Sequence, residues 1–396
     1  MVRDLRRERT GGQSRVTNIE LFFDLVYVFA VTQLSHYLLR HLTVTGALQV
    51  ALLLVRVWLL WAYTTWVTNW LDPERIPVRL LLLGLMLVSL VMSAGLPEAF
   101  GDGGLLIGGA YAVMQIGRSA FAVWALTGTA LRRNYERILC WCCVSGALAV
   151  AGGLASGGWR DGLWLAAVGV DLAGGLAGFW APGLGRSATR EWDIEGGHFA
   201  ERCQAFILIA LGESLVVIGA TLAGLLAGPL SGPHARAGPA IIAFGLAFVG
   251  SAGLWWLYFD RTAAASARAI AEAADPGALG RSAYHLIHPV MVAGIIVVAA
   301  ADDIVLSHPG ERAGLTTALL ILGGTALYLA GLAAFRAVVW HTWSVPRLAG
   351  VAAAALLGLL APHVSVLVLA ACAAAVVVGV AVADDLVPGG EPAPES

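Results

Sequence analysis

The chain has 396 residues, of which 59% are hydrophobic and only 13% are charged, and its mean hydropathy is +0.79. Soluble domains carry about 25% charged residues, so this composition excludes a soluble globular protein and indicates an integral membrane protein. All 24 basic residues are arginine and the net charge is −2. A charge balance this close to neutral predicts no nucleic-acid partner.

Twelve apolar stretches have the length of a helix that spans a bilayer. They cover residues 17–39, 46–70, 79–97, 103–127, 138–156, 162–182, 199–227, 239–260, 282–303, 315–339, 347–361 and 364–383. We therefore predict an all-α integral membrane protein, a multi-pass bundle of about 12 transmembrane helices in the bacterial cell membrane.

Three segments follow from this pattern. Residues 1–16 form a basic, cytoplasmic N-terminal segment, and residues 17–383 form the polytopic transmembrane domain. Residues 384–396 are acidic and rich in Pro and Gly, which predicts a disordered tail. The five cysteines lie in or beside apolar stretches, so we predict small buried hydrophobic side chains and no disulfide framework.

The loop arginines predict the orientation of the chain. With alternating loops, sixteen arginines fall on the side of the N-terminus and four on the opposite side, while four more lie within helices: Arg56, Arg118, Arg202 and Arg336. Cytoplasmic loops are the arginine-rich ones, so both termini are predicted to be cytoplasmic. Residues 261–280, the longest internal connection, fit a short helix at the membrane surface or a soluble linker equally well.

Two carboxylates in the first apolar stretch need partners. Glu20 and Asp24 are four residues apart and share one face of a helix, and a carboxylate at the bilayer centre costs roughly 2.5–3.5 kcal/mol on translocon scales. Arg202 and Glu213 are eleven residues apart on one face of a later helix, about 16 Å along its axis. Arg202 is therefore expected to meet Asp24 or Glu20, and Glu213 is expected to be the central titratable group.

Other polar residues lie at a similar predicted depth. Their helices cover 17–39, 46–70, 199–227, 239–260 and 282–303, which predicts one polar cavity open to the cytoplasm. The candidate catalytic residues are Glu213, Asp24, Glu20, His285 and His288. The candidate substrate-binding or charge-pairing residues are Arg202, Arg118, Asn69, His198, Glu201, Asp260 and Tyr284.

Simpler interpretations remain open for some of these residues. Asp260 and His198 lie close to helix ends, where contacts with lipid headgroups explain them equally well. The Trp and Tyr residues of 61–70 and 255–258 are more typical of an interfacial aromatic belt. The His285-x-x-His288 spacing with Glu213 or Asp24 fits a nitrogen–oxygen site for zinc or iron only weakly, so we predict no metal, and the pattern identifies no cofactor.

The same residues resemble a known family, the bacterial low-temperature-requirement A membrane proteins. The matching motifs are Glu20-Leu-Phe-Phe-Asp24-Leu-Val-Tyr-Val-Phe-Ala30, the Trp/Tyr-rich run that ends at Asn69, His198 with Glu201-Arg202, Leu211-Gly-Glu213-Ser214, Trp255-Trp-Leu-Tyr-Phe-Asp260, and Tyr284-His285 with His288. The resemblance spans most of the chain in the same order. It implies a polytopic membrane protein, with growth in the cold as the phenotype that named the family, and it brings no reaction or substrate.

Three classes of function fit these residues. The favoured class is a proton-coupled carrier or channel for a small solute or ion, with Glu213, Asp24 and the histidines as relay groups. The alternative is an intramembrane enzyme that acts on a lipid or isoprenoid by carboxylate and histidine acid–base chemistry. The third is a structural or regulatory membrane protein. Membrane lipid is a predicted partner in each case, and a continuous polar path would distinguish a transporter from an enzyme with a blind pocket.

Overall fold

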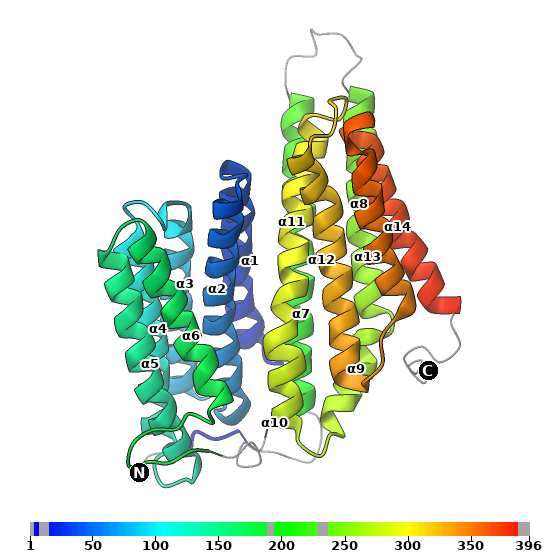
Figure 1. Ribbon diagram of the computed structural model, residues 1–396. Helices are drawn as coiled ribbons and strands as arrows, with labels where there is room; N and C mark the ends of the chain where they lie inside the picture. The colour runs from blue at the N-terminus through cyan, green and yellow to red at the C-terminus, as the bar shows by residue number, and fades with distance from the viewer. Residues whose placement is uncertain (1–3, 8–15, 188–193, 228–236, 387–396) are drawn as a thin grey trace. The chain divides into compact units, whose positions relative to one another are not determined.

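The structure, a computed structural model, describes residues 4–7, 16–187, 194–227 and 237–386 (Figure 1). Within these residues the regular structure is helical, apart from three isolated β-bridges. The helices are α1 (Asn18–Arg40), α2 (Val44–Trp70), α3 (Ile76–Gly95), η1 (Leu96–Glu98), α4 (Gly104–Ala125), α5 (Leu131–Leu154), α6 (Gly158–Leu176), α7 (Gly196–Ala227), α8 (Ala237–Phe259), α9 (Thr262–Ala271), α10 (Pro276–Leu279), η3 (Gly280–Ile287), α11 (His288–Ser307), α12 (Leu315–Trp340), α13 (Val345–Leu357), η4 (Gly358–His363) and α14 (Val366–Leu386).

The chain divides into two compact units. Unit 1 comprises Met1–Tyr37, Thr43–Ala205 and Ala271–Gly280, and unit 2 comprises Leu38–Leu42, Phe206–Ile270 and Arg281–Ser396. Unit 1 therefore contains most of α1, all of α2 to α6 and the beginning of α7. Unit 2 contains the rest of α7 together with α8, α9 and α11 to α14. Helix α7 contributes residues to both units.

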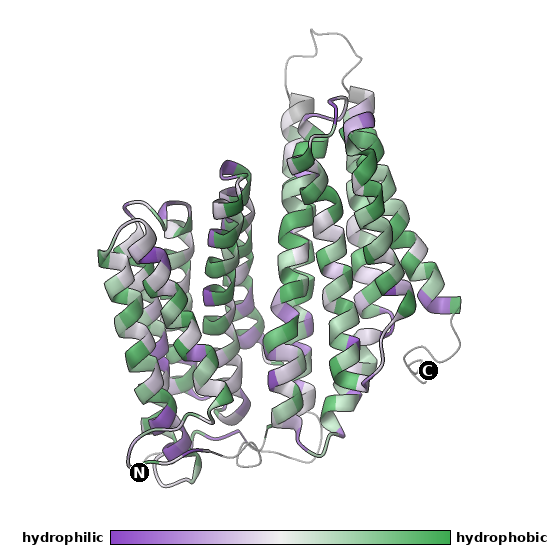
Figure 2. Cartoon of the chain, in the orientation of Figure 1, coloured by the Kyte–Doolittle hydropathy of each residue, from purple (hydrophilic) through white to green (hydrophobic). Residues whose placement is uncertain are grey.

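Every predicted apolar stretch contains a helix, but the predicted count of twelve membrane spans is not confirmed. Eleven helices in the described part of the chain are long and apolar enough to cross a membrane. Helix α6 is not one of them, because its 19 residues include Arg160, Asp161 and Asp171. In Figure 2 most of the helical ribbon is green or pale, and purple, hydrophilic positions are scattered along it. The chain is a multi-pass, all-α membrane protein, and the sidedness of its termini stays a prediction.

Helix α2 has buried residues along most of its length. It begins after Thr43, whose hydroxyl accepts a hydrogen bond from the Gly46 amide at 3.0 Å and caps the helix. Where α2 ends, the N-terminal segment pairs with it: the Arg7 amide donates to the Trp70 carbonyl at 2.8 Å, and the Asp72 amide donates to the Leu5 carbonyl at 2.9 Å. This pairing holds Arg7 beside the end of α2.

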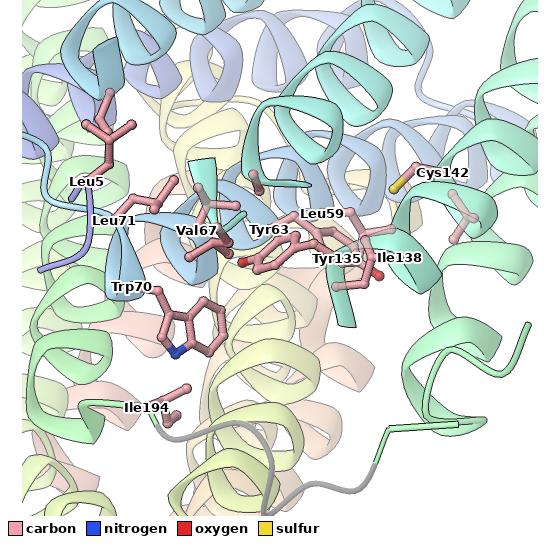
Figure 3. Close-up of a cluster of buried hydrophobic side chains, with 14 residues drawn as sticks. Leu5, Leu59, Tyr63, Val67, Trp70, Leu71, Tyr135, Ile138, Cys142 and Ile194 are labelled. Atoms are coloured by element: carbon pink, nitrogen blue, oxygen red, sulfur yellow. The ribbon is translucent and has the colours of Figure 1, made fainter. Parts of the chain in front are cut away.

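A cluster of buried hydrophobic side chains packs around the same end of α2 (Figure 3). Val67 and Trp70 of α2 meet Tyr135 and Ile138 of α5, and Leu5 joins them from the N-terminal segment. Burying apolar area stabilises a fold by about 25 cal/mol per Å² relative to water. Within a bilayer the hydrophobic effect between helices is small, because lipid tails are as apolar as the side chains. Close packing of the helices therefore contributes more of the stability.

Helices α11 and α12 approach each other closely enough to require glycine. A Cβ atom at Gly324 would lie 2.9 Å from the Val298 amide nitrogen, and one at Gly294 would lie 2.7 Å from the Tyr328 amide nitrogen. Both distances are too short for a real side chain. At the adjacent Gly323 nothing lies within 4 Å of such an atom, so of these two glycines only Gly324 is needed for the contact.

A π-helical turn, η3, precedes α11. Pro289 has no amide hydrogen and cannot donate to the carbonyl of His285, so the regular α-helical bond is missing there. π-turns inside longer helices usually mark such interruptions and are common at functional sites. This turn contains Tyr284 and His285, two residues that the sequence singled out.

Several segment predictions change in detail. Residues 261–280 form α9 and α10 for the most part, with Thr262 and Ile270 buried. Helix α14 continues to Leu386, so Asp384 is helical and not part of a disordered tail, and the remaining tail residues lie outside the described part. Cys142 is buried, but Cys140 and Cys143 are exposed on α5, so the prediction of buried cysteines was wrong for these two.

Candidate functional site

Four charged side chains and one histidine meet inside unit 1. This acid–arginine cluster consists of Arg7, Glu20, Asp24, His198 and Arg202. Arg202 donates from Nη2 to Asp24 at 2.5 Å, from Nε to the second oxygen of Asp24 at 3.0 Å, and from Nη1 to Glu20 at 3.1 Å. Glu20, Asp24 and Arg202 are all 0% exposed. The fork-shaped guanidinium therefore binds Asp24 with two bonds and Glu20 with one.

Glu20 is also the acidic residue in the first turn of α1. Thr17 lies just before this helix, and its amide and its hydroxyl both donate to Glu20 Oε2 at 2.9 Å. Arg7 donates to the same oxygen at 3.2 Å. Glu20 is thus fixed by its own helix end, by the N-terminal segment and by α7.

His198 lies between Glu20 and α2. Its Nε2 is 3.0 Å from Glu20 Oε1, and its Nδ1 is 3.4 Å from the amide nitrogen of Asn69. Asn69 accepts a hydrogen bond from the Glu195 amide at 2.8 Å, which fixes its NH₂ group toward His198. Arg7 Nη1 lies 2.8 Å from the same Nε2, so a guanidinium and a carboxylate both face this ring nitrogen.

Helix α2 supplies further hydrogen bonds to this cluster. The Trp61 indole donates to Asp24 at 2.7 Å, and the Arg202 guanidinium donates to the Thr68 hydroxyl at 3.4 Å. Arg7 donates to the Thr68 carbonyl at 3.2 Å. Two carboxylates and two guanidinium groups give the cluster a formal charge of zero. Buried charges in proteins are tolerated when they are paired and hydrogen-bonded in this way.

A second buried polar group lies between α2, α4 and α6. Arg118 donates to the Leu60 carbonyl at 3.2 Å and to the Thr64 hydroxyl at 3.5 Å, and it is also bonded to Gln115. Gln115 in turn donates to Asp171 at 3.0 Å. Tyr111 donates to the same carboxylate. Arg118, which the sequence placed near mid-membrane, therefore pairs through Gln115 with Asp171 and is not part of the acid–arginine cluster.

Arg56 lies on α2 about one helical turn before Leu60, and its surroundings are different. Its guanidinium packs between the rings of Tyr111 and Trp164, 4.4 Å from each ring centroid, and is 2% exposed. In the described residues its three side-chain nitrogens have no hydrogen-bond partner. The buried guanidinium is therefore stabilised by cation–π contacts with these two rings. Such contacts contribute about 2 kcal/mol or more when they are desolvated.

Together these groups form a polar row along α2. Asn69, Thr68, Trp61, Thr64 and Arg56 are all buried on this one helix. From Asn69 to Arg56 the row extends about 20 Å, at 1.5 Å per residue, against a hydrocarbon core of about 30 Å. The row includes the acid–arginine cluster near the C-terminal end of α2 and, closer to the middle of α2, the Arg118 group.

The remaining predicted residues lie mostly in unit 2. Glu213 is 2% exposed on α7, and the neighbouring Ser214 hydroxyl is 3.4 Å from that of Ser251 on α8. His288 Nε2 is 2.7 Å from the Tyr258 hydroxyl, and the Tyr284 ring stacks on His288 at 4.9 Å between centroids. In this part of the protein the polar contacts link α7, α8 and α11.

Asp260 lies at the end of α8, beside a cavity of about 110 Å³. It is partly exposed and 3.5 Å from Arg261, as the interpretation of a helix-end residue implies. In the same cavity wall Arg347 donates to Asp384 at 2.8 Å. Glu201, in unit 1, accepts a long hydrogen bond from the Val16 amide at 3.4 Å.

The matches with known proteins cover nearly the whole chain. The sequence model of the bacterial low temperature requirement A protein family matches residues 15–382. The chain belongs to this family. It is 36% identical over 329 residues to a Rhizobium meliloti (strain 1021) protein named uncharacterized protein RA0937. The aligned residues make up 83% of this chain and 78% of that relative. No solved structure matches the chain significantly.

For this family member, the structure brings five of the predicted site residues into contact with one another. Glu20, Asp24, Asn69, His198 and Arg202 contact one another in unit 1. Arg7 is a member of the cluster that the sequence pattern did not indicate, because its place depends on the backbone pairing of Leu5 and Arg7 with the end of α2. Among the described residues no three His, Cys, Asp or Glu side chains are grouped to hold a metal ion.

Proposed function

We propose that this low temperature requirement A family protein is a proton-coupled carrier or channel for a small solute or ion. The polar row of unit 1 is the observation that supports this proposal. Ionisable groups within a bilayer are rare, and in transporters they form ion or proton pathways. The row contains buried carboxylates, hydroxyls and guanidinium groups and extends along about two thirds of the hydrocarbon thickness. A bundle with a purely structural role does not need such a row.

The acid–arginine cluster is the coupling element in this proposal. Its charges cancel, so adding one proton to Asp24 or Glu20 leaves an excess positive charge at Arg202, which sits on α7. Burying an unpaired charge is costly, on the order of several kcal/mol. Protonation would therefore weaken the attachment of α7 to α1 and α2, and a solute or ion that binds while α7 is released would be coupled to the proton.

Proton flux in proteoliposomes tests the proposal. The purified protein is reconstituted with a pH-sensitive dye inside, and a potassium gradient with valinomycin sets the membrane potential. The assay is repeated with panels of inorganic cations, amino acids, sugars and carboxylates. We expect proton influx above that of protein-free vesicles under at least one of these conditions. Asp24→Asn is expected to abolish it, because the amide keeps the shape of the side chain but cannot bind the proton.

Asp72→Asn is the matched control. Asp72 is partly exposed and pairs with Arg75 at 3.1 Å outside the acid–arginine cluster, so this variant should keep full flux. An absence of flux under every condition, together with a protein-dependent change in a lipid extract, would support the intramembrane enzyme instead. Equal flux in the wild type and in Asp24→Asn would remove the cluster from the mechanism.

A further inference from the structure

Unit 2 contains an intramembrane carboxylate, Asp302, that is not part of the polar row. Asp302 is on α11 and borders a cavity of about 30 Å³ between α8, α11, α12 and α14. The wall of this cavity is made of small or apolar residues such as Gly250 of α8, Ala301 of α11 and Ala373 of α14. The only hydroxyl in the wall is that of Thr325 on α12. Asp302 is five residues before the end of α11, so it lies within the membrane-spanning part.

Asp302 differs from its neighbour Asp303 in how it is satisfied. Asp302 is 9% exposed, and its Oδ2 is buried without a hydrogen-bond partner among the described residues. Asp303 instead accepts a hydrogen bond from Thr221 of α7 at 2.8 Å. The Thr325 hydroxyl already donates to the Ile321 carbonyl at 3.0 Å and has no second hydrogen to give to Asp302.

The surroundings decide what this carboxylate can bind. The cavity wall contributed by α8, α12 and α14 contains no charged or titratable side chain, so no cation of the protein neutralises Asp302 there. A hard metal cation needs about six oxygen ligands, whereas this wall offers side-chain oxygens of Asp302 and Thr325 only. The cavity has room for only about one or two water molecules, which is too little for an organic cation.

We propose that Asp302 is a proton-binding site: it takes one proton within the membrane and is held there as the neutral acid. A neutral carboxyl avoids the large cost of an isolated ion in an apolar medium. The inference rests on the proposed function in one respect, since it assigns to unit 2 a carboxyl that loads and releases the transported proton. The proton-binding state itself is measurable without any transport assay.

A hydrophobic carbodiimide tests the inference directly. A protonated carboxyl in an apolar site adds across one C=N bond of dicyclohexylcarbodiimide, and the O-acylisourea rearranges to a stable N-acylurea, so the peptide gains the whole reagent mass. We expect labelling of the Asp302 peptide in proteoliposomes at neutral pH, located by fragmentation in the mass spectrometer. The labelled fraction should fall at least tenfold when the pH is raised far enough to ionise the carboxyl.

Two adjacent substitutions provide the controls. Asp302→Asn should lose the label, and Asp303→Asn should keep it. Infrared spectroscopy of the wild type needs no variant, and it should show a buried carboxylic acid C=O band that disappears over the same pH range. Absence of both the label and the band, or a label on Asp303 alone, would overturn the inference. If the label is found but no proton flux is measured, the binding site stands and the transport proposal fails.

Discussion

At the scale of residues, Arg202 determines the electrostatics of unit 1. Its guanidinium contacts two carboxylates, and Arg7 balances the remaining negative charge. All contacts of Arg202 are buried, so salt in the solvent screens them little. The stability of the cluster therefore depends more on its net charge after a substitution than on the individual hydrogen bonds.

A double-mutant cycle tests this charge count. Asp24→Asn leaves two guanidinium groups against one carboxylate, and Arg202→Gln leaves two carboxylates against one guanidinium. Each is expected to destabilise the protein by about 3–5 kcal/mol, as for other buried pairs that lose one partner. The double variant restores neutrality through Arg7 and Glu20. It should cost less than the sum of the two by about 0.5–3 kcal/mol.

Unfolding by SDS in mixed micelles measures these four free energies. Asp72→Asn, at a partly exposed pair, should change the free energy of unfolding by less than about 1 kcal/mol. Strict additivity of the two cluster substitutions would show that Arg202 and Asp24 do not act as one charge-balanced group.

Glu213 stays the predicted central titratable residue of the protein. It is 2% exposed on α7, and Glu213→Gln keeps its size while removing its proton. We expect this variant to accumulate and fold normally and to lose activity, and Glu213→Asp to retain part of it. Proton flux and fluorescence-detected size exclusion on the same preparations provide the measurement. Full activity of Glu213→Gln, or loss of activity only because the protein does not accumulate, would mark the residue as structural.

At the scale of elements, adjacent glycines on α12 offer a matched pair of substitutions. Gly324→Ala places a methyl group 2.9 Å from the Val298 amide nitrogen of α11, whereas Gly323→Ala meets nothing within 4 Å. Overpacking of this kind costs typically 1–3 kcal/mol, and alanine gains up to about 1 kcal/mol of helix propensity over glycine. Gly324→Ala should therefore destabilise the protein, while Gly323→Ala should be neutral or stabilising. Equal effects in SDS unfolding would contradict the close approach of the two helices.

Much of this architecture was predictable because membrane helices carry a strong, local signal. The apolar stretches predicted all the long helices, including α6, although its three charges place it outside the eleven apolar spans. The pairing of Arg202 with helix α1 was also predictable, since an unpaired carboxylate in a bilayer is costly. The π-turn before Pro289 and the role of Arg7 depend on local backbone geometry and on an extended segment. Neither has a periodic pattern in the sequence.

At the scale of the whole molecule, the side of the membrane on which the chain ends depends on α6. If α6 crosses the membrane together with the eleven apolar helices, the count is even and both termini are cytoplasmic, as the sixteen-to-four arginine distribution predicts. Reporter fusions at Ser396 and at Gly232 measure this. We expect a cytoplasmic signal at Ser396 and an external one at Gly232. An external Ser396 would mean an odd number of crossings.

The distance along the chain between the two halves of the acid–arginine cluster has a consequence for biosynthesis. Asp24 and Arg202 are 178 residues apart, so at translation rates of roughly 5–20 residues per second α1 waits about 10–35 s for its partner. During that interval two carboxylates occupy a newly inserted helix. Arg7 is only 13 residues from Glu20, and the end of α2 that holds it is made long before Arg202. Once α2 is in place, we expect the N-terminal arginine to act as the counter-ion of Glu20 until α7 arrives and completes the cluster.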